Sequence, residues 1–251
     1  MIRRELATFF AALGYFTRFP VPAWVGYSAD GLARAARYLP AIGLLVGGFG
    51  ALVFWLAMHV WAQPVAVVLS MVAAIALTGA FHEDGLSDTA DGLGGGWDKA
   101  KILAIMKDSR VGSYGVIAIV LALLGKFALL ASLPAGEVAV ALIAGHAVSR
   151  FFAVSLMATM DYARDDESSK ARPVAARLGN GPLLVALFFA GLPLLLLAPQ
   201  QIGPAIALAA MATFWLAAKC RRWLGGYTGD CLGAVQQVAE IAFYLGLVAN
   251  I

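Results

Sequence analysis

Four carboxylates stand close together in the first half of the sequence. Glu83, Asp84, Asp88 and Asp91 lie within nine residues, and no lysine or arginine is nearer than Lys99. If this segment is helical, Asp84, Asp88 and Asp91 share one face, because their spacings are four and three residues. Like charges at such spacings destabilise a helix, so we expect a bound cation to hold them together.

The chemistry of this acidic run favours a hard divalent metal ion. The chain has two cysteines and three histidines and no cluster of either, so Mg²⁺, with Mn²⁺ as an alternative, is favoured over zinc. Mg²⁺ binds a few carboxylates together with substrate phosphate, which indicates diphosphate chemistry. We therefore take Asp84, Asp88 and Asp91 as metal ligands. The alternative is an acid-rich helix end that merely faces water, and His82 is either an interfacial residue or a substrate contact.

A glycine-rich stretch follows the acids directly. Residues 92–96 contain four glycines. Glycine permits positive φ and close backbone approach, as loops that cradle phosphate require. We therefore expect Gly94 and Gly95 to bind substrate phosphate, although the stretch matches neither the P-loop nor the dinucleotide-binding motif.

The next segment, residues 98–110, predicts a short amphipathic helix with a basic end. Lys107 and Arg110 are placed to neutralise a diphosphate, with Asp108 as a further ligand or a base. The alternative is that the basic pair anchors the next membrane span at the cytoplasmic face.

Further polar residues stand out from apolar surroundings. A charge inside a span costs about 2.5–3.5 kcal/mol and usually faces the bundle interior, so Arg150 is either a phosphate ligand or part of an ion pair. Lys126 has no evident partner except Glu240. Asp230 lies among four glycines and is a second candidate for the site. The charge-mixed loop 161–181 is either a solvated loop or a lid.

The composition places these residues in a membrane protein. Of 251 residues, 61% are hydrophobic and 13% charged, against about 45–50% and about 25% in soluble domains. Seven apolar segments approach the ~20 residues that a bilayer crossing needs. We predict one all-α membrane domain over residues 1–251, with about seven transmembrane helices and a short interfacial helix at residues 5–19. The predicted spans are 39–62, 64–81, 112–133, 138–160, 182–199, 203–218 and 232–251.

Basic residues lie almost entirely on one side of these spans. The N-terminus and the four long polar loops hold every Lys and Arg except Lys126 and Arg150, and the turns on the other side hold none. The positive-inside rule places the acidic run at the cytoplasmic face of the membrane. Polar loops on one face suit an enzyme with cytoplasmic substrates, because a transporter needs polar machinery open to both sides.

Three longer motifs complete the pattern: HEDGLSDTADG at 82–92, MKDSRVG at 106–112 and GYTGDCLGA at 226–234. Together they resemble the cobalamin (5′-phosphate) synthases, also called adenosylcobinamide-GDP ribazoletransferases. The resemblance runs from Phe16 to the C-terminus. Ser87 stands where alanine is expected, and Gly-Trp-Asp at 96–98 replaces Gly-Arg-Asp, which removes one basic phosphate contact.

The resemblance implies the joining of an activated corrinoid to a nucleoside, a late step of cobalamin biosynthesis. The 3′-hydroxyl of α-ribazole, or of its 5′-phosphate, attacks the phosphorus nearest cobinamide in adenosylcobinamide-GDP, and GMP leaves. Metal held by the aspartates would bridge the diphosphate. Glu83 or Asp108 would take the hydroxyl proton, and Arg110 and Arg150 would hold phosphate oxygens. The expected partners are corrinoid and nucleoside substrates and the lipid bilayer, not nucleic acid; a homo-oligomer is left open.

Two rival functions make different demands on the sequence. A CDP-alcohol phosphotransferase also uses a DxxDG motif. That family further needs an arginine at position 96 and aspartates at positions 109 and 113, where this chain has Gly96, Ser109 and Ser113. A transporter or channel would need polar groups through both halves of the bundle and loops on both faces. Neither pattern is present in the sequence.

Overall fold

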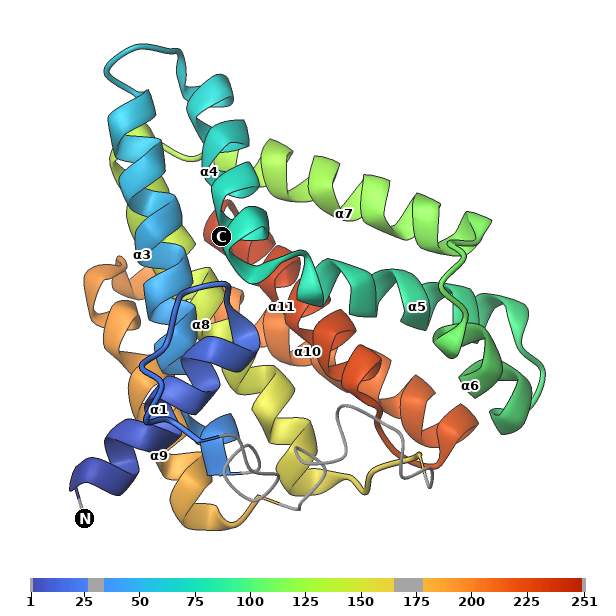
Figure 1. The fold of residues 1–251 in the computed structure, drawn as a ribbon. Coiled ribbons are helices and arrows are strands. Elements are labelled where there is room, and N and C mark those ends of the chain that lie inside the picture. Colours follow the sequence, from blue (N-terminus) through green and yellow to red (C-terminus); the bar gives the residue numbers. More distant parts are fainter. Residues whose placement is uncertain (1, 27–33, 165–177, 250–251) are drawn as a thin grey trace.

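The described part of the chain is helical. Figure 1 shows the computed structural model, which describes residues 2–26, 34–164 and 178–249. Within these ranges the one β feature is an isolated bridge between Tyr162 and Tyr227, so the all-α prediction is confirmed. The elements are α1 (Ile2–Phe16), η1 (Ala36–Tyr38), α3 (Leu39–Ala57), α4 (Gln63–Thr78), α5 (Phe81–Gly95), α6 (Lys99–Lys107), α7 (Ser113–Ser132), α8 (Ala135–Thr159), α9 (Asn180–Gly191), η3 (Leu192–Leu196), α10 (Pro199–Leu224) and α11 (Gly229–Leu247).

The chain is a multi-pass helical membrane protein with fewer clear crossings than the sequence predicts. By length and composition, α7, α8, α10 and the continuous helix η1–α3 can each cross a bilayer, and α4 with α5 qualifies only as a bent pair. The described ranges therefore hold four candidate spans, or five with that pair. The predicted spans at 182–199 and 232–251 are not among them. α9 ends after 12 residues, and polar Gln236, Gln237 and Glu240 interrupt the apolar character of α11.

A sharp turn separates the apolar α4 from the polar α5. The two helices meet at 87°, through Gly79 (φ 68°) and Ala80 (φ 60°) in the left-handed conformation. Glycine adopts this conformation freely, whereas alanine pays roughly 1–2 kcal/mol. Carboxylates are expensive in hydrocarbon, so we take α5 to lie at the polar surface beyond the end of α4.

Close helix packing holds the bundle around α8. A side chain at Gly43 of α3 would overlap with the backbone of His146, and one at Gly47 would lie 2.6 Å from the carbonyl oxygen of Leu142. Small residues allow such close approach between membrane helices. In Figure 1, α5 and α7 run beside each other, and α11 passes between them and α8. α11 therefore links the polar helix to the apolar bundle.

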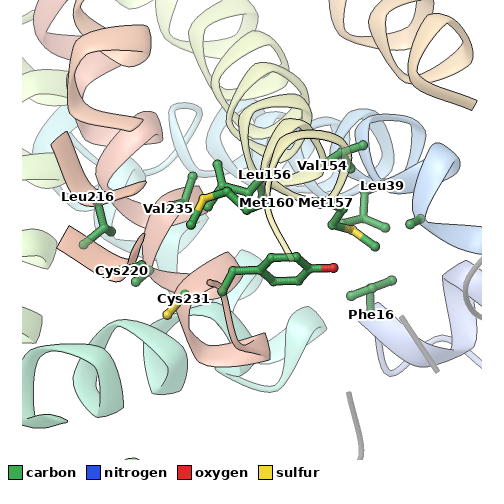
Figure 2. Packing of buried hydrophobic residues seen from close by; sticks show 14 of the residues in the cluster. Phe16, Leu39, Val154, Leu156, Met157, Met160, Leu216, Cys220, Cys231 and Val235 are labelled. Carbon is green, nitrogen blue, oxygen red and sulfur yellow. The ribbon is translucent and has the colours of Figure 1, made fainter. Parts of the chain in front are cut away.

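A buried apolar cluster fixes the start of α11. Figure 2 shows Phe16, Leu39, Met157, Cys220 and Cys231 among its members, which come from α1, α3, α8, α10 and α11. Both cysteines are free and buried. Cys231 lies in the first turn of α11. The cluster therefore also fixes the position of Asp230, the residue before it in the chain, at the end of the bundle.

Candidate functional site

All four carboxylates of the acidic run lie on α5, so the condition under which Asp84, Asp88 and Asp91 share one face is met. Glu83 and Asp84 occupy its first turn, where the helix N-terminus favours negative charge. Asp84 is exposed, Asp88 is half-buried and Asp91 is buried. The face that these three aspartates share therefore runs from the surface into the protein.

Asp91 caps the N-terminus of α7. Its Oδ2 accepts the backbone N–H of Gly112 at 2.7 Å, and its Oδ1 accepts that of Gly115 at 2.8 Å. A side chain at either glycine would overlap with the carboxylate. Gly112, the last residue of the motif at 106–112, therefore donates a backbone hydrogen bond to Asp91. Both oxygens of Asp91 are engaged, so this residue would contribute to a metal only through the lone pairs that remain.

α11 brings a further aspartate to the acidic face. Gly85 of α5 packs so closely on Asp230 that a side chain there would lie 2.8 Å from the Asp230 carbonyl oxygen. Burial, followed by the charges of Asp84, Asp230 and Asp91, raises the pKa of Asp88 to about 7. Burial also raises the pKa of Asp230. Asp84, Asp88 and Asp230 therefore interact as one group, here called the acidic cluster.

The donor set of the acidic cluster fits a hard cation that is shared with a substrate. Mg²⁺ characteristically takes one or two carboxylates and completes its shell with water and phosphate oxygens. A cation would also relieve the repulsion that contributes to the high pKa of Asp88. Among the described residues, no three His, Cys, Asp or Glu side chains converge as a metal site. The described residues therefore do not form an all-protein metal cage.

The predicted phosphate-cradling glycine loop is wrong. Gly92, Gly94 and Gly95 belong to α5, and none of them has a positive φ. A side chain at Gly92 would lie 2.7 Å from Cγ of Met106, and one at Gly94 would lie 2.7 Å from Cγ of Tyr114. These glycines let α6 and α7 approach α5. Phosphate contact by Gly94 and Gly95 stays a prediction without a loop to support it.

The predicted short helix after the acids is α6, and its basic end forms a local ion pair. Asp98 caps the helix by accepting a first-turn backbone N–H at 2.9 Å. Arg110 donates from Nη2 to Oδ2 of Asp108 at 2.6 Å, and its hydrogen bonds lower the pKa of Asp108 to about 2. A carboxylate with so low a pKa accepts a proton poorly near neutrality. Lys107 is exposed at the end of α6.

Glu83 faces the bundle interior. Its Oε1 accepts the side-chain amide of Gln237 at 3.0 Å. It lines a cavity of about 20 Å³, which has room for about one water molecule. Within the described ranges, Oε2 of Glu83, Oε1 of Gln237 and Nε of Arg150 are buried without a hydrogen-bond partner, and all three residues line this cavity. These atoms are candidate partners for a water molecule in the cavity.

Arg150 belongs to a buried polar network that lines this cavity. Its Nη1 donates to the carbonyl oxygen of His146 at 2.9 Å, and only 2% of the residue is exposed. Nearby, Lys126 pairs with Glu240 at 3.1 Å, so the partner expected for Lys126 is confirmed. Gln236 also donates to Glu240 at 2.5 Å. The described contact of Arg150 is with His146, and both the ion pair and the phosphate binding proposed for Arg150 stay predictions.

Sequence reasoning missed the cation of the acidic cluster. Arg164 donates from Nη2 to Oδ2 of Asp230 at 2.7 Å. The only sequence signal was its place in the charge-mixed loop 161–181. Most of that loop, residues 165–177, lies outside the described residues, so the choice between a solvated loop and a lid stays untested.

Comparison with known proteins connects this geometry to a family. A family model described as cobalamin-5-phosphate synthase matches residues 8–248. The chain belongs to the cobalamin-5-phosphate synthase family. It is 47% identical to the adenosylcobinamide-GDP ribazoletransferase of Leptothrix cholodnii, with 98% of this chain and 97% of the relative covered. It is 48% identical to the enzyme of that name in Ralstonia nicotianae, over 99% and 97% of the two chains. No solved structure matches.

The three motifs that resemble the cobalamin-5-phosphate synthase family meet at one place. The motif at 82–92 lies on α5, and the motif at 106–112 leads to the backbone N–H that Asp91 accepts. The motif at 226–234 opens α11 and packs Asp230 against α5. The fold therefore joins the segments that carry the family resemblance around the acidic cluster.

Proposed function

We propose that this chain transfers the cobinamide phosphate of adenosylcobinamide-GDP to α-ribazole or its 5′-phosphate. The 3′-hydroxyl forms a bond to the phosphorus nearest cobinamide, the diphosphate bond breaks, and GMP leaves with the electron pair. The observation that carries this proposal is the family match over residues 8–248. The acidic cluster, formed by two of its motifs, supplies carboxylate donors suited to the reaction.

For the metal, we propose Mg²⁺, with Mn²⁺ as a substitute, held by Asp84 and Asp88 with Asp91 beside them. Bound there, such an ion would supply stabilisation of the negative charge that develops on the leaving phosphate. Asp91 holds the start of α7 in place through its two backbone hydrogen bonds. Asp230 adds a third carboxylate to the cluster and is proposed as a substrate-binding or ligand residue.

For the base, we propose Glu83 ahead of Asp108. Arg110 stabilises the ionised form of Asp108 and lowers its pKa to about 2, which makes proton uptake from a hydroxyl unfavourable. Glu83 has one oxygen held by Gln237 and the other without a partner in the described structure. We propose that this oxygen takes the hydroxyl proton through a water molecule in the cavity.

For the diphosphate, we propose contacts from Lys107 and Arg110 near the end of α6. Both side chains are exposed, and Arg110 would have to exchange Asp108 for phosphate oxygens. Arg150, Gly94 and Gly95 are kept as further phosphate contacts, although Arg150 is buried and the glycines are helical. The site is proposed to face the cytoplasm of a bacterial inner membrane, because the basic residues lie on the side of the polar loops.

The experiment that tests the proposed function is product identification with the purified protein. The chain is incubated in detergent with Mg²⁺, adenosylcobinamide-GDP and α-ribazole 5′-phosphate, and the products are identified by mass spectrometry. We expect equal amounts of GMP and adenosylcobalamin 5′-phosphate. A parallel incubation contains a CDP-alcohol instead of the corrinoid. Release of CMP there, with no GMP from the corrinoid, would contradict the proposal.

A further inference from the structure

A short backbone pairing ties the segment after α8 to the segment before α11. The backbone N–H of Ala163 donates to the Tyr227 carbonyl oxygen at 2.8 Å, and that of Tyr227 donates to the Asp161 carbonyl oxygen at 3.0 Å. A side chain at Gly226 would overlap with the Asp161 carbonyl group, so this approach requires glycine. The rings of Tyr162 and Tyr227 also pack edge to face. The pairing therefore fixes the backbone next to Arg164.

This pairing delivers the guanidinium of Arg164 to the acidic cluster. Its Nη2 lies 2.7 Å from Oδ2 of Asp230, and 16% of its side chain is exposed. Thr228 also donates to the same oxygen at 3.4 Å. Of the charged groups that act on Asp88 in the described structure, Arg164 is the one cation. Its charge therefore bears on the whole cluster as well as on Asp230.

One N–H donor of the Arg164 guanidinium is not used by any described residue. Its Nε is buried and has no hydrogen-bond partner among the described residues. A buried N–H without a partner costs free energy, and a guanidinium presents its donors as a planar fork that matches phosphate oxygens. Asp230 holds one arm of this fork in place. The Nε–H of the same guanidinium, which no described residue accepts, is the donor left to bind an anion.

We propose that Arg164 binds the diphosphate of the corrinoid substrate, with Asp230 as the residue that orients it. This inference rests on the proposed function, because the diphosphate is that of adenosylcobinamide-GDP. The charge of Arg164 has opposite effects on the two ligands. It repels a divalent cation at Asp84 and Asp88, and it attracts the diphosphate that completes the shell of that cation.

Two variants separate these effects. Arg164→Gln removes the charge, so the free protein should bind Mn²⁺ about threefold more tightly or better. The same variant loses a charged hydrogen bond to phosphate, so its KM for adenosylcobinamide-GDP should rise about 10- to 100-fold. Arg164→Lys keeps the charge without the fork. It should leave the Mn²⁺ affinity unchanged and still raise KM about tenfold or more.

The measurements use the full chain in detergent. Binding of Mn²⁺ alone is followed by the electron paramagnetic resonance signal of the free ion, and KM and kcat come from GMP release. Arg221→Gln is the matched control, since Arg221 is an exposed arginine whose guanidinium donates to the Thr159 carbonyl oxygen at 3.2 Å. This control should change neither Mn²⁺ affinity nor KM.

The outcomes distinguish this inference from the proposed function. If the wild type releases GMP and both Arg164 variants keep KM within about twofold, the inference is overturned and the proposed function stands. If Arg164→Gln weakens Mn²⁺ binding, Arg164 only supports the fold of the cluster and the inference is also overturned. If Arg164→Gln does not fold, the KM of Arg164→Lys decides. If the wild type releases no GMP, the proposed function fails, and diphosphate binding by Arg164 fails with it.

Discussion

Replacing Asp88 with asparagine should make the metal-free protein more stable at neutral pH. Burial and the charges of Asp84, Asp230 and Asp91 raise the pKa of Asp88 from 3.8 to about 7 in the folded protein. Between these values the folded state keeps a proton that the unfolded chain has lost. The stability that Asp88 contributes is therefore complete below pH 3.8 and is lost as the pH rises through about 7. Asparagine does not titrate, so the variant avoids this loss.

The size of the effect follows from the pKa difference. A change from 3.8 to about 7 corresponds to about 4 kcal/mol at ~1.4 kcal/mol per pKa unit. Asp88 is only half-buried, and solvent screening reduces this figure to about 1–2 kcal/mol. For a chain of this size we expect the unfolding temperature to rise by about 2–8 °C.

The two buried cysteines make the assay direct. Cys220 and Cys231 are 0% exposed, so a thiol-reactive dye reports unfolding as they become accessible. Wild type and Asp88→Asn are heated in EDTA at pH 8 and at pH 5, and the gain should be larger at pH 8. Asp98→Asn serves as a control, because Asn caps a helix about as well as Asp. An Asp88→Asn variant that is no more stable than wild type at pH 8 would refute the reasoning.

Three further variants test individual contacts. Glu83→Gln should lower kcat for GMP release about 100-fold or more, while Asp108→Asn should keep most of it; the reverse order would make Asp108 the base. Asp91→Ala removes the cap of α7, so the free energy of unfolding should fall by about 1–2 kcal/mol, and an unchanged unfolding curve would contradict the cap. Lys126→Met leaves Glu240 buried without its ion-pair partner and should cost about 3–5 kcal/mol. Adding Glu240→Gln to Lys126→Met should recover much of that loss. A double variant as unstable as Lys126→Met alone would contradict the ion pair.

The helix that carries the acids was predictable because its signal is local. Spacings of four and three residues place Asp84, Asp88 and Asp91 on one face of any helix, and the structure has that helix. The role of Asp91 was not predictable in the same way. Its partners lie 21 and 24 residues further along the chain, and only the packing of α7 on α5 brings them together.

The glycine run was misinterpreted because glycine can serve either to permit unusual backbone angles or to leave room for a neighbouring element. Both uses look the same in the sequence. The run at 92–96 predicted a loop, since glycine permits unusual backbone angles. In the structure, Gly92 and Gly94 instead leave room for side chains from α6 and α7. At Gly226 the close approach is between backbones and positions Arg164. A single sequence does not distinguish these cases, because the neighbour that needs the room is distant in the chain.

The number of membrane crossings also depends on more than local hydropathy. The apolar stretch at 182–199 meets the composition of a span, but α9 ends at Gly191 and η3 follows it. In α11, Gln236 donates to buried Ser149, and Glu240 pairs with buried Lys126. These partners make a polar helix acceptable in the bundle interior, which average hydropathy does not register.

GMP release by Asp84→Asn and Asp88→Asn tests the central claim most directly. The claim is that the acidic cluster on α5 and α11 holds the cation for diphosphate displacement. With Mg²⁺, adenosylcobinamide-GDP and α-ribazole 5′-phosphate, we expect both variants to lose GMP release while they still unfold cooperatively. Asp98→Asn, the same chemical change at the cap of α6, should remain fully active. Full activity in both cluster variants would contradict the account.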